Sequence, residues 1–77
     1  MTSATDLWDI GVLIYYICKG KYINYTTFKE REFKGEDLSV DLIDFVNRLL
    51  IMNPSERLGA KNINELKNHS FFKNFDW

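Results

Sequence analysis

The sequence predicts an all-α fold of about three helices joined by irregular connections. Three observations support this prediction: two apolar stretches follow helical spacing, a serine suited to capping a helix precedes each, and a third capped segment follows a proline turn. The 77 residues leave room for one small domain at most. Apolar residues make up 45% of the chain and charged residues 27%, a balance typical of a globular domain and not of a disordered segment.

The first helix is expected near residues 5–19. Ser3 with Asp6 three positions later matches a capping box, and Gly20 is typical of a helix stop. Apolar residues on this helix form a stripe and also cover much of the remaining circumference, so it is expected to have neighbours on every side. The stripe consists of Leu7, Ile10, Ile14, Ile17 and Cys18. Residues 21–38 are mostly polar, and we expect a connector there with a short helical turn around 27–33.

The second helix is expected near 39–52, with Ser39 as its N-cap and Asn53-Pro54 at its end. Pro54 can open a short helical turn, and Gly59 can adopt a left-handed conformation. A short third helix is expected near 62–69, and an aromatic tail follows over residues 70–77.

The charges and the few special residues limit the function classes. Ten basic and eleven acidic side chains are mixed along the sequence, so we expect neither a nucleic-acid partner nor a membrane partner. Cys18 is the single cysteine and His69 the single histidine, which excludes an internal disulfide and a clustered His and Cys metal site. The acidic start does not match a secretory signal, and the apolar run at 7–18 is short for a membrane span, so an intracellular, cytoplasmic location is expected.

Two segments resemble a known family in the correct order. The segment Asp6-Leu7-Trp8-Asp9-Ile10-Gly11 is similar to the central helix of the protein-kinase large lobe. The segments Asn53-Pro54-Ser55-Glu56-Arg57-Leu58-Gly59 and His69-Ser70-Phe71-Phe72 through Trp77 are similar to the last helices of that lobe. The second set specifically resembles the cyclic-nucleotide-dependent, AGC-type serine/threonine kinases. The resemblance implies a partial kinase large lobe, with residues 21–38 forming a shortened connector where the family has a docking helix.

Four residues match structural positions of the family. The resemblance implies that Asp6 hydrogen-bonds the backbone of the catalytic loop and that Trp8 packs in the lobe. It further implies that Gly11 allows close approach of another element, and that Arg57 pairs with a buried glutamate of the activation segment. Neither the catalytic loop nor that glutamate is in this sequence, so a carboxylate for Arg57 must come from elsewhere.

The parts that perform phosphoryl transfer are missing from the sequence. It contains no Gly-rich loop, His-Arg-Asp or Asp-Phe-Gly, and its four glycines are dispersed. We therefore assign no catalytic, cofactor-binding or metal-binding residue, and expect ATP and Mg only in a complete parent kinase. For His69 we favour a packing or capping role over general-base chemistry, and for Cys18 a place in the core. Asp41 and Asp44 are expected to stabilise a helix dipole. The segment 72–75 could dock in another protein's groove, although packing at the end of the lobe is favoured.

Three hypotheses about function follow. The chain is a non-catalytic structural or protein-interaction piece derived from a kinase, or the terminal part of an active ATP-dependent serine/threonine kinase, or an unrelated helical binding module. In the first two, its partner is another protein or the missing remainder of the kinase domain. The ordered match along the chain places the third hypothesis last.

Overall fold

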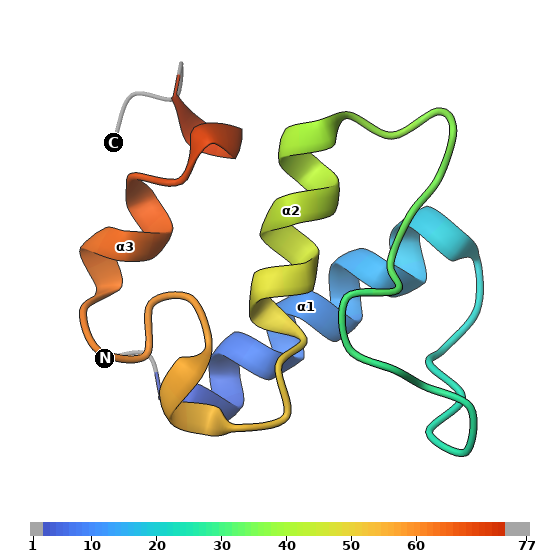
Figure 1. The fold of residues 1–77 in the computed structure, drawn as a ribbon, viewed down its shortest axis with the longest axis horizontal. Coiled ribbons are helices and arrows are strands. Elements are labelled where there is room, and N and C mark those ends of the chain that lie inside the picture. Colours follow the sequence, from blue (N-terminus) through green and yellow to red (C-terminus); the bar gives the residue numbers. More distant parts are fainter. Residues whose placement is uncertain (1–2, 74–77) are drawn as a thin grey trace.

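The computed structural model describes residues 3–73, and its all-α fold in this range confirms the predicted fold class. The helices are α1 (Ala4–Lys19), α2 (Val40–Leu49) and α3 (Ile63–Lys67). Two 3₁₀ turns, η1 (Pro54–Glu56) and η2 (Ser70–Phe72), lie between and after the later helices. Figure 1 shows α2 crossing α1, the connector 20–39 running along one side and α3 lying on the other. Of the aromatic tail expected at 70–77, residues 74–77 lie outside the described residues.

Local hydrogen bonds fix both ends of α1. The Ser3 hydroxyl accepts from the Asp6 N–H at 3.2 Å, and the Asp6 carboxylate accepts from the Ser3 N–H at 3.0 Å. This is a capping box, which satisfies two backbone donors that have no partner within the helix. At the other end Gly20 adopts a left-handed conformation with φ 72°, and its N–H donates to the Tyr16 carbonyl at 2.8 Å.

Gly11 sets the distance between α1 and α2. It is buried, and a Cβ atom added there would lie 2.8 Å from Leu50 Cδ2 and 3.0 Å from Leu49 Cβ. Because those contacts are shorter than van der Waals packing allows, the absence of a side chain permits the crossing.

We expect Gly11→Ala to lower the free energy of unfolding by about 1–2 kcal/mol, because the overpacking at Leu49 outweighs the better helix propensity of alanine. Urea denaturation followed by circular dichroism measures the change. Thr5→Ala is the matched control, since Thr5 is exposed on the same helix and its replacement should leave stability unchanged or slightly raised. Equal stability of Gly11→Ala and Thr5→Ala would contradict the close approach.

Helix α2 separates two apolar clusters. Phe45 and Leu49 face one cluster, and Val46 and Leu50 face the other. The first cluster also contains Leu7 and Leu66, and the second contains Ile23 and Phe33 from the connector. Cys18 packs against the second cluster as a partly buried residue. The connector is therefore part of the core, although most of its residues are polar.

Helix α2 ends at Leu49, earlier than the boundary near residue 52 that the sequence suggests. Leu50 takes φ −90° and ψ 53°, which leaves the helical region, and the carbonyls of Ile51 and Met52 then accept hydrogen bonds from the Arg57 side chain. The expected short third helix is likewise shorter than 62–69 and ends at Lys67. Pro54 does open a 3₁₀ turn, and Gly59 is left-handed with φ 87°.

The helical turn expected around 27–33 is not formed. The Phe33 N–H donates to the Asn47 side-chain oxygen at 3.1 Å, and the Asn47 amide donates to the Phe33 carbonyl at 3.0 Å. This pair of hydrogen bonds occupies both backbone groups of Phe33. Since a helix would need the same groups for its own ladder, the segment stays irregular, with a turn at residues 30–31 where Arg31 has φ 63°.

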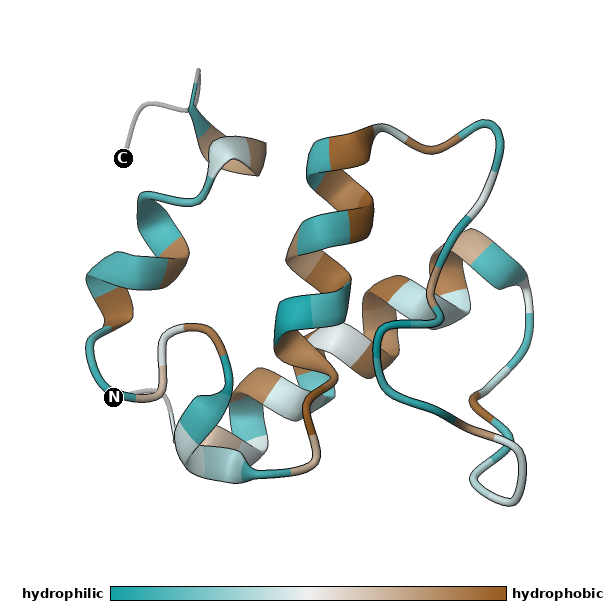
Figure 2. Cartoon of the chain, in the orientation of Figure 1, coloured by the Kyte–Doolittle hydropathy of each residue, from teal (hydrophilic) through white to brown (hydrophobic). Residues whose placement is uncertain are grey.

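One face of α1 is apolar and exposed. Leu13 keeps 59% and Ile17 70% of its surface in contact with solvent, and Ile10 and Tyr16 are also exposed. Figure 2 shows brown, hydrophobic segments recurring between white and teal ones along the turns of α1 that are in view. The expectation of neighbours on every side therefore holds for one face only within the described residues. We call Ile10, Leu13, Tyr16 and Ile17 the outer face of α1.

Candidate functional site

The Arg57 side chain ties the beginning of α1 to the chain that follows α2. Its Nε donates to the Ile51 carbonyl at 2.8 Å and its Nη1 to the Ala4 carbonyl at 2.8 Å. A longer bond of 3.4 Å joins Nη2 to the Met52 carbonyl. The position of Arg57 follows from η1, whose cap at Asn53 turns the chain back toward α1. Three backbone carbonyls therefore hold this half-buried cation in the position where the resemblance implies a carboxylate.

Trp8 forms the other wall of the Arg57 site. The guanidinium carbon lies 4.8 Å from the centre of the Trp8 ring, which is within cation–π range. Tyr25 stacks against Trp8 with ring centres 6.4 Å apart, and Phe28 meets it edge-on at 5.9 Å. The indole N–H donates to the Tyr25 hydroxyl at 3.4 Å. Trp8 thus joins Arg57 to the connector.

A hollow of about 290 Å³ opens beside Arg57 and is lined mainly by charged side chains. A guanidinium has five N–H donors, and three of those on Arg57 bond to carbonyls, which leaves one on each terminal nitrogen. Arg31, Arg48 and Lys61 add positive charge to the lining, against Glu56 and Glu65. The hollow can accept a carboxylate from outside the described residues.

Asp6 and Gly11 occupy different surroundings from Arg57. The Asp6 carboxylate is exposed and is used in the capping box. Hydrogen bonds from Ser3, the backbone N–H first and then the hydroxyl, hold the pKa of Asp6 below its usual value. Gly11 lies at the crossing of α1 and α2. Three of the four positions of the resemblance therefore lie on different sides of α1, and only Trp8 contacts Arg57, so the four do not converge on one cavity.

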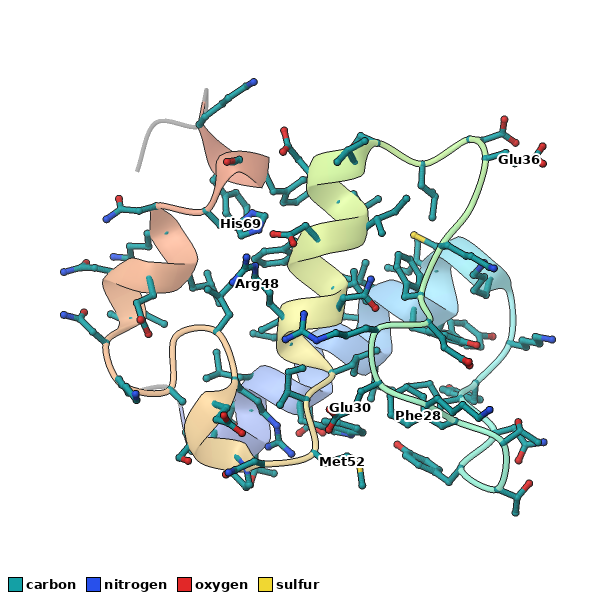
Figure 3. The ribbon with its side chains drawn as sticks, viewed as in Figure 1. Phe28, Glu30, Glu36, Arg48, Met52 and His69 are labelled. Carbon is teal, nitrogen blue, oxygen red and sulfur yellow. The ribbon has the colours of Figure 1, made fainter. Side chains whose placement is uncertain are left out.

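A second polar cluster joins α2 to the C-terminal end. His69 Nε2 lies 2.6 Å from a carboxylate oxygen of Asp44, and Arg48 Nε lies 2.7 Å from the same oxygen. The Phe71 N–H donates to His69 Nδ1 at 3.0 Å, so Nδ1 carries no proton and Nε2 donates to Asp44. Figure 3 shows His69 and Arg48 facing each other between the C-terminal segment and α2.

The His69 cluster is built for structure and not for catalysis. Nδ1 caps η2, Nε2 holds Asp44, and the imidazole packs edge-on against Phe45 at 5.3 Å. Both nitrogens are thus occupied, and the side chain is only 7% exposed, so no nitrogen remains to accept a proton from a substrate. Within residues 3–73, no group of three or more His, Cys, Asp and Glu side chains is placed to hold a metal ion.

Curated relatives match nearly the whole chain. Serine/threonine-protein kinase RIM15 of Saccharomyces cerevisiae is 44% identical over 90 residues, which include 94% of this chain and 5% of the relative. Serine/threonine protein kinase ypkA of Aspergillus fumigatus is 37% identical over 87 residues, which include 99% of this chain and 14% of the relative. Serine/threonine-protein kinase SCH9 of Saccharomyces cerevisiae is 36% identical over 87 residues, which include 99% of this chain and 11% of the relative. The chain is a C-terminal kinase-like segment of the AGC-type serine/threonine kinases. The resemblance seen in the sequence is confirmed.

The kinase-like segment spans only a small part of these relatives' length. The alignment with RIM15 is longer than the 77-residue chain, so the relative contributes residues there that this segment lacks. No family profile matches the chain, and no solved structure matches it. Among the described residues, no helix is both long and apolar enough to cross a membrane.

The sequence did not indicate the pairing of Asp44 with His69. The two residues are separated by 25 positions, and Asp44 was assigned only a role near the helix N-terminus. An acid followed by Arg48 four residues later is a recognisable helix pair, but nothing local connects either residue to His69.

We expect Asp44→Asn to lower the free energy of unfolding of the kinase-like segment by about 0.5 kcal/mol near neutral pH and to have no effect in strong acid. Burial acts to raise the pKa of Asp44, but hydrogen bonds from His69 and Arg48 outweigh it and leave the pKa lowered. A lowered folded-state pKa stabilises the fold above the unfolded value of about 3.9, and this stabilisation is lost as pH falls through the folded-state pKa.

Urea midpoints of the wild type and Asp44→Asn at pH 7 and pH 2.5 test this expectation. The other titrating groups are the same in both chains, so their difference isolates Asp44. A difference of equal size at both pH values would show that the ionised carboxylate does not contribute.

Proposed function

We propose that this kinase-like segment is a structural part of a serine/threonine kinase domain, docked on the remainder of that domain through the outer face of α1. The observation that supports this most directly is the exposure of Ile10, Leu13, Tyr16 and Ile17 on one helix face. Adjacent apolar side chains in a row of this kind mark an interaction surface. Covering a leucine or isoleucine fully is worth about 1.5–3 kcal/mol, so the four together can supply several kcal/mol to docking.

The Arg57 site supports the same proposal. Its two remaining N–H groups and the hollow beside it suit a carboxylate, and the resemblance implies a glutamate of the activation segment there. The carbonyls of Ala4 and Ile51 already hold the guanidinium in place. An incoming carboxylate therefore meets a cation that is already oriented, which reduces the entropy lost on docking.

Phosphoryl transfer belongs to the remainder of the domain in this proposal. The sequence has no Gly-rich loop, His-Arg-Asp or Asp-Phe-Gly, so ATP and Mg would be held by residues outside it. The segment contributes a rigid support, because Gly11 and Arg57 fix α1 against α2.

A second candidate is a separate, non-catalytic interaction piece that docks on another protein through the same face. The alignment with RIM15, which is longer than this chain, supports it, because residues that the relative carries are missing here. The nucleotide sequence upstream of Met1 separates the two candidates. An in-frame Gly-rich loop and catalytic-loop aspartate would support the first, and an upstream stop codon would support the second.

Complementation of a divided kinase tests the first candidate. The RIM15 kinase domain is expressed without its matched segment, and this chain is added in trans. We expect the chain to restore phosphorylation of a protein substrate and Leu13→Glu/Ile17→Glu to fail, because the two charges would be buried. Val40→Glu is the control, since Val40 is equally apolar and 81% exposed but lies at the start of α2. Failure of the wild-type chain, or full activity of the double variant, would contradict the proposal.

A further inference from the structure

A second hollow, of about 400 Å³, lies between the end of α1 and the connector. Its size is in the range of pockets that hold a small ligand or a few residues of a peptide. Four lysines contribute to its lining, and Glu32 is the one acid among them. The lysines are Lys19, Lys21, Lys29 and Lys34. We call this the lysine hollow.

Folding concentrates positive charge in the lysine hollow. Four of the ten basic residues line it, but only one of the eleven acidic residues does. The rest of the chain therefore holds six basic and ten acidic residues. The order of charges along the sequence, in which both signs are mixed, does not show this separation.

Most of these charges have no partner in the fold. Lys19 is engaged, because its ammonium donates to the Lys34 carbonyl and lies 5.5 Å from the centre of the Phe33 ring. For the ammonium groups of Lys21, Lys29 and Lys34, the described part of the chain provides neither an ion pair nor a hydrogen bond. Like charges around one hollow repel each other, and an anion placed among them relieves that repulsion.

The uncharged lining of the hollow is mostly apolar, with Asn24 and Thr27 as its polar members, and it is held in place. Tyr15, Tyr22, Ile23, Phe28 and Phe33 contribute its aromatic and aliphatic walls. Asn47 fixes the connector at Phe33 through two hydrogen bonds. Glu30 fixes it again, since its carboxylate accepts from the Met52 N–H at 2.6 Å, and Figure 3 shows these two residues side by side. The hollow is thus formed before any ligand arrives.

We propose that the lysine hollow binds a short acidic peptide segment of a partner protein, with carboxylates on the lysines and an aromatic or branched apolar side chain against the walls. A long nucleic acid fits less well, because the chain outside the hollow has an excess of four negative charges and would repel a polyanion. The inference does not rest on the proposed kinase role, since it uses neither the outer face of α1 nor Arg57.

Fluorescence anisotropy of the folded 77-residue chain with labelled peptides tests the proposal. The probe is a peptide of four glutamates around one phenylalanine, and the matched peptide has glutamine in place of each glutamate. We expect the acidic peptide to bind at least tenfold more tightly, and binding to weaken as salt rises. Lys29→Gln and Lys34→Gln should each weaken it by up to about fivefold, the effect of one exposed charge pair.

Three comparisons decide the outcome. Lys73→Gln is the matched control, because Lys73 is exposed at the end of η2 and does not line the hollow. This variant should bind the peptide as tightly as the wild type does. The charge-reversed double variant Lys29→Glu/Lys34→Glu should instead bind a peptide of four lysines around one phenylalanine more tightly than the acidic peptide. A misfolded chain would not show this reversal of preference. Equal binding of the acidic and glutamine peptides, an equal loss with Lys73→Gln, or tighter binding of a single-stranded oligonucleotide of the same charge would overturn the proposal.

Discussion

Replacing Phe45 with alanine is expected to lower the free energy of unfolding by about 3–5 kcal/mol, the largest effect of any substitution considered for this chain. Phe45 is 2% exposed and is surrounded by three other rings. The ring centres of His69, Phe71 and Phe72 lie 5.3, 5.2 and 5.1 Å from its own. Truncation would leave a cavity and release η2 from α2, because these contacts hold the two together.

Urea denaturation followed by circular dichroism measures the loss at Phe45. Phe71→Ala is the matched control, because Phe71 is 39% exposed and belongs to the same cluster, and it should cost much less. Small domains have only about 5–15 kcal/mol of stability, so a loss of this size removes a large fraction of it and should lower the urea midpoint strongly. A loss below about 1 kcal/mol would contradict the packing described for η2.

The second large effect is expected at Arg57. Arg57→Ala should lower the free energy of unfolding by about 3 kcal/mol, since it removes hydrogen bonds between a charged donor and three carbonyls and the contact with Trp8. Arg57→Lys keeps the charge but cannot reach three acceptors at once, so it should recover only part of the loss. Arg48→Gln breaks an exposed helix pair and should cost at most about 1 kcal/mol.

The indole signal of Trp8 in proton NMR spectra checks the cause of the Arg57 effect. Arg57→Ala should shift this signal because the guanidinium lies over the ring, while Arg48→Gln should leave it unchanged. Equal free energies of unfolding for Arg57→Ala and Arg48→Gln would show that the hydrogen bonds from Arg57 to the backbone carbonyls do not hold α1 in place.

The helix starts could be predicted because their causes are local. Ser3 and Ser39 cap helices within three residues of themselves, and Gly20 ends α1 with one left-handed residue. The end of α2 could not be predicted, because it depends on Arg57 binding carbonyls after the helix. The helical turn expected in the connector was wrong for a similar reason. Asn47, which is distant in sequence, binds the N–H and the carbonyl of Phe33.

The candidate site was only partly visible in the sequence. The resemblance drew attention to Trp8, Gly11 and Arg57, but not to the carbonyls that Arg57 binds. The Asp44–His69 pair and the lysine hollow were missed, because each brings together residues that share no local pattern. The sequence showed that α1 is apolar around most of its circumference. Only the fold showed that its outer face is the part left exposed to solvent.

Methyl NMR spectra of this chain, recorded with and without the part of the RIM15 kinase domain that precedes the matched segment, test most directly whether the outer face of α1 is a docking surface. We predict that the methyl signals of Ile10, Leu13 and Ile17 shift on mixing while that of Val40 stays in place. Shifts at Val40 with unchanged signals along α1 would contradict the account.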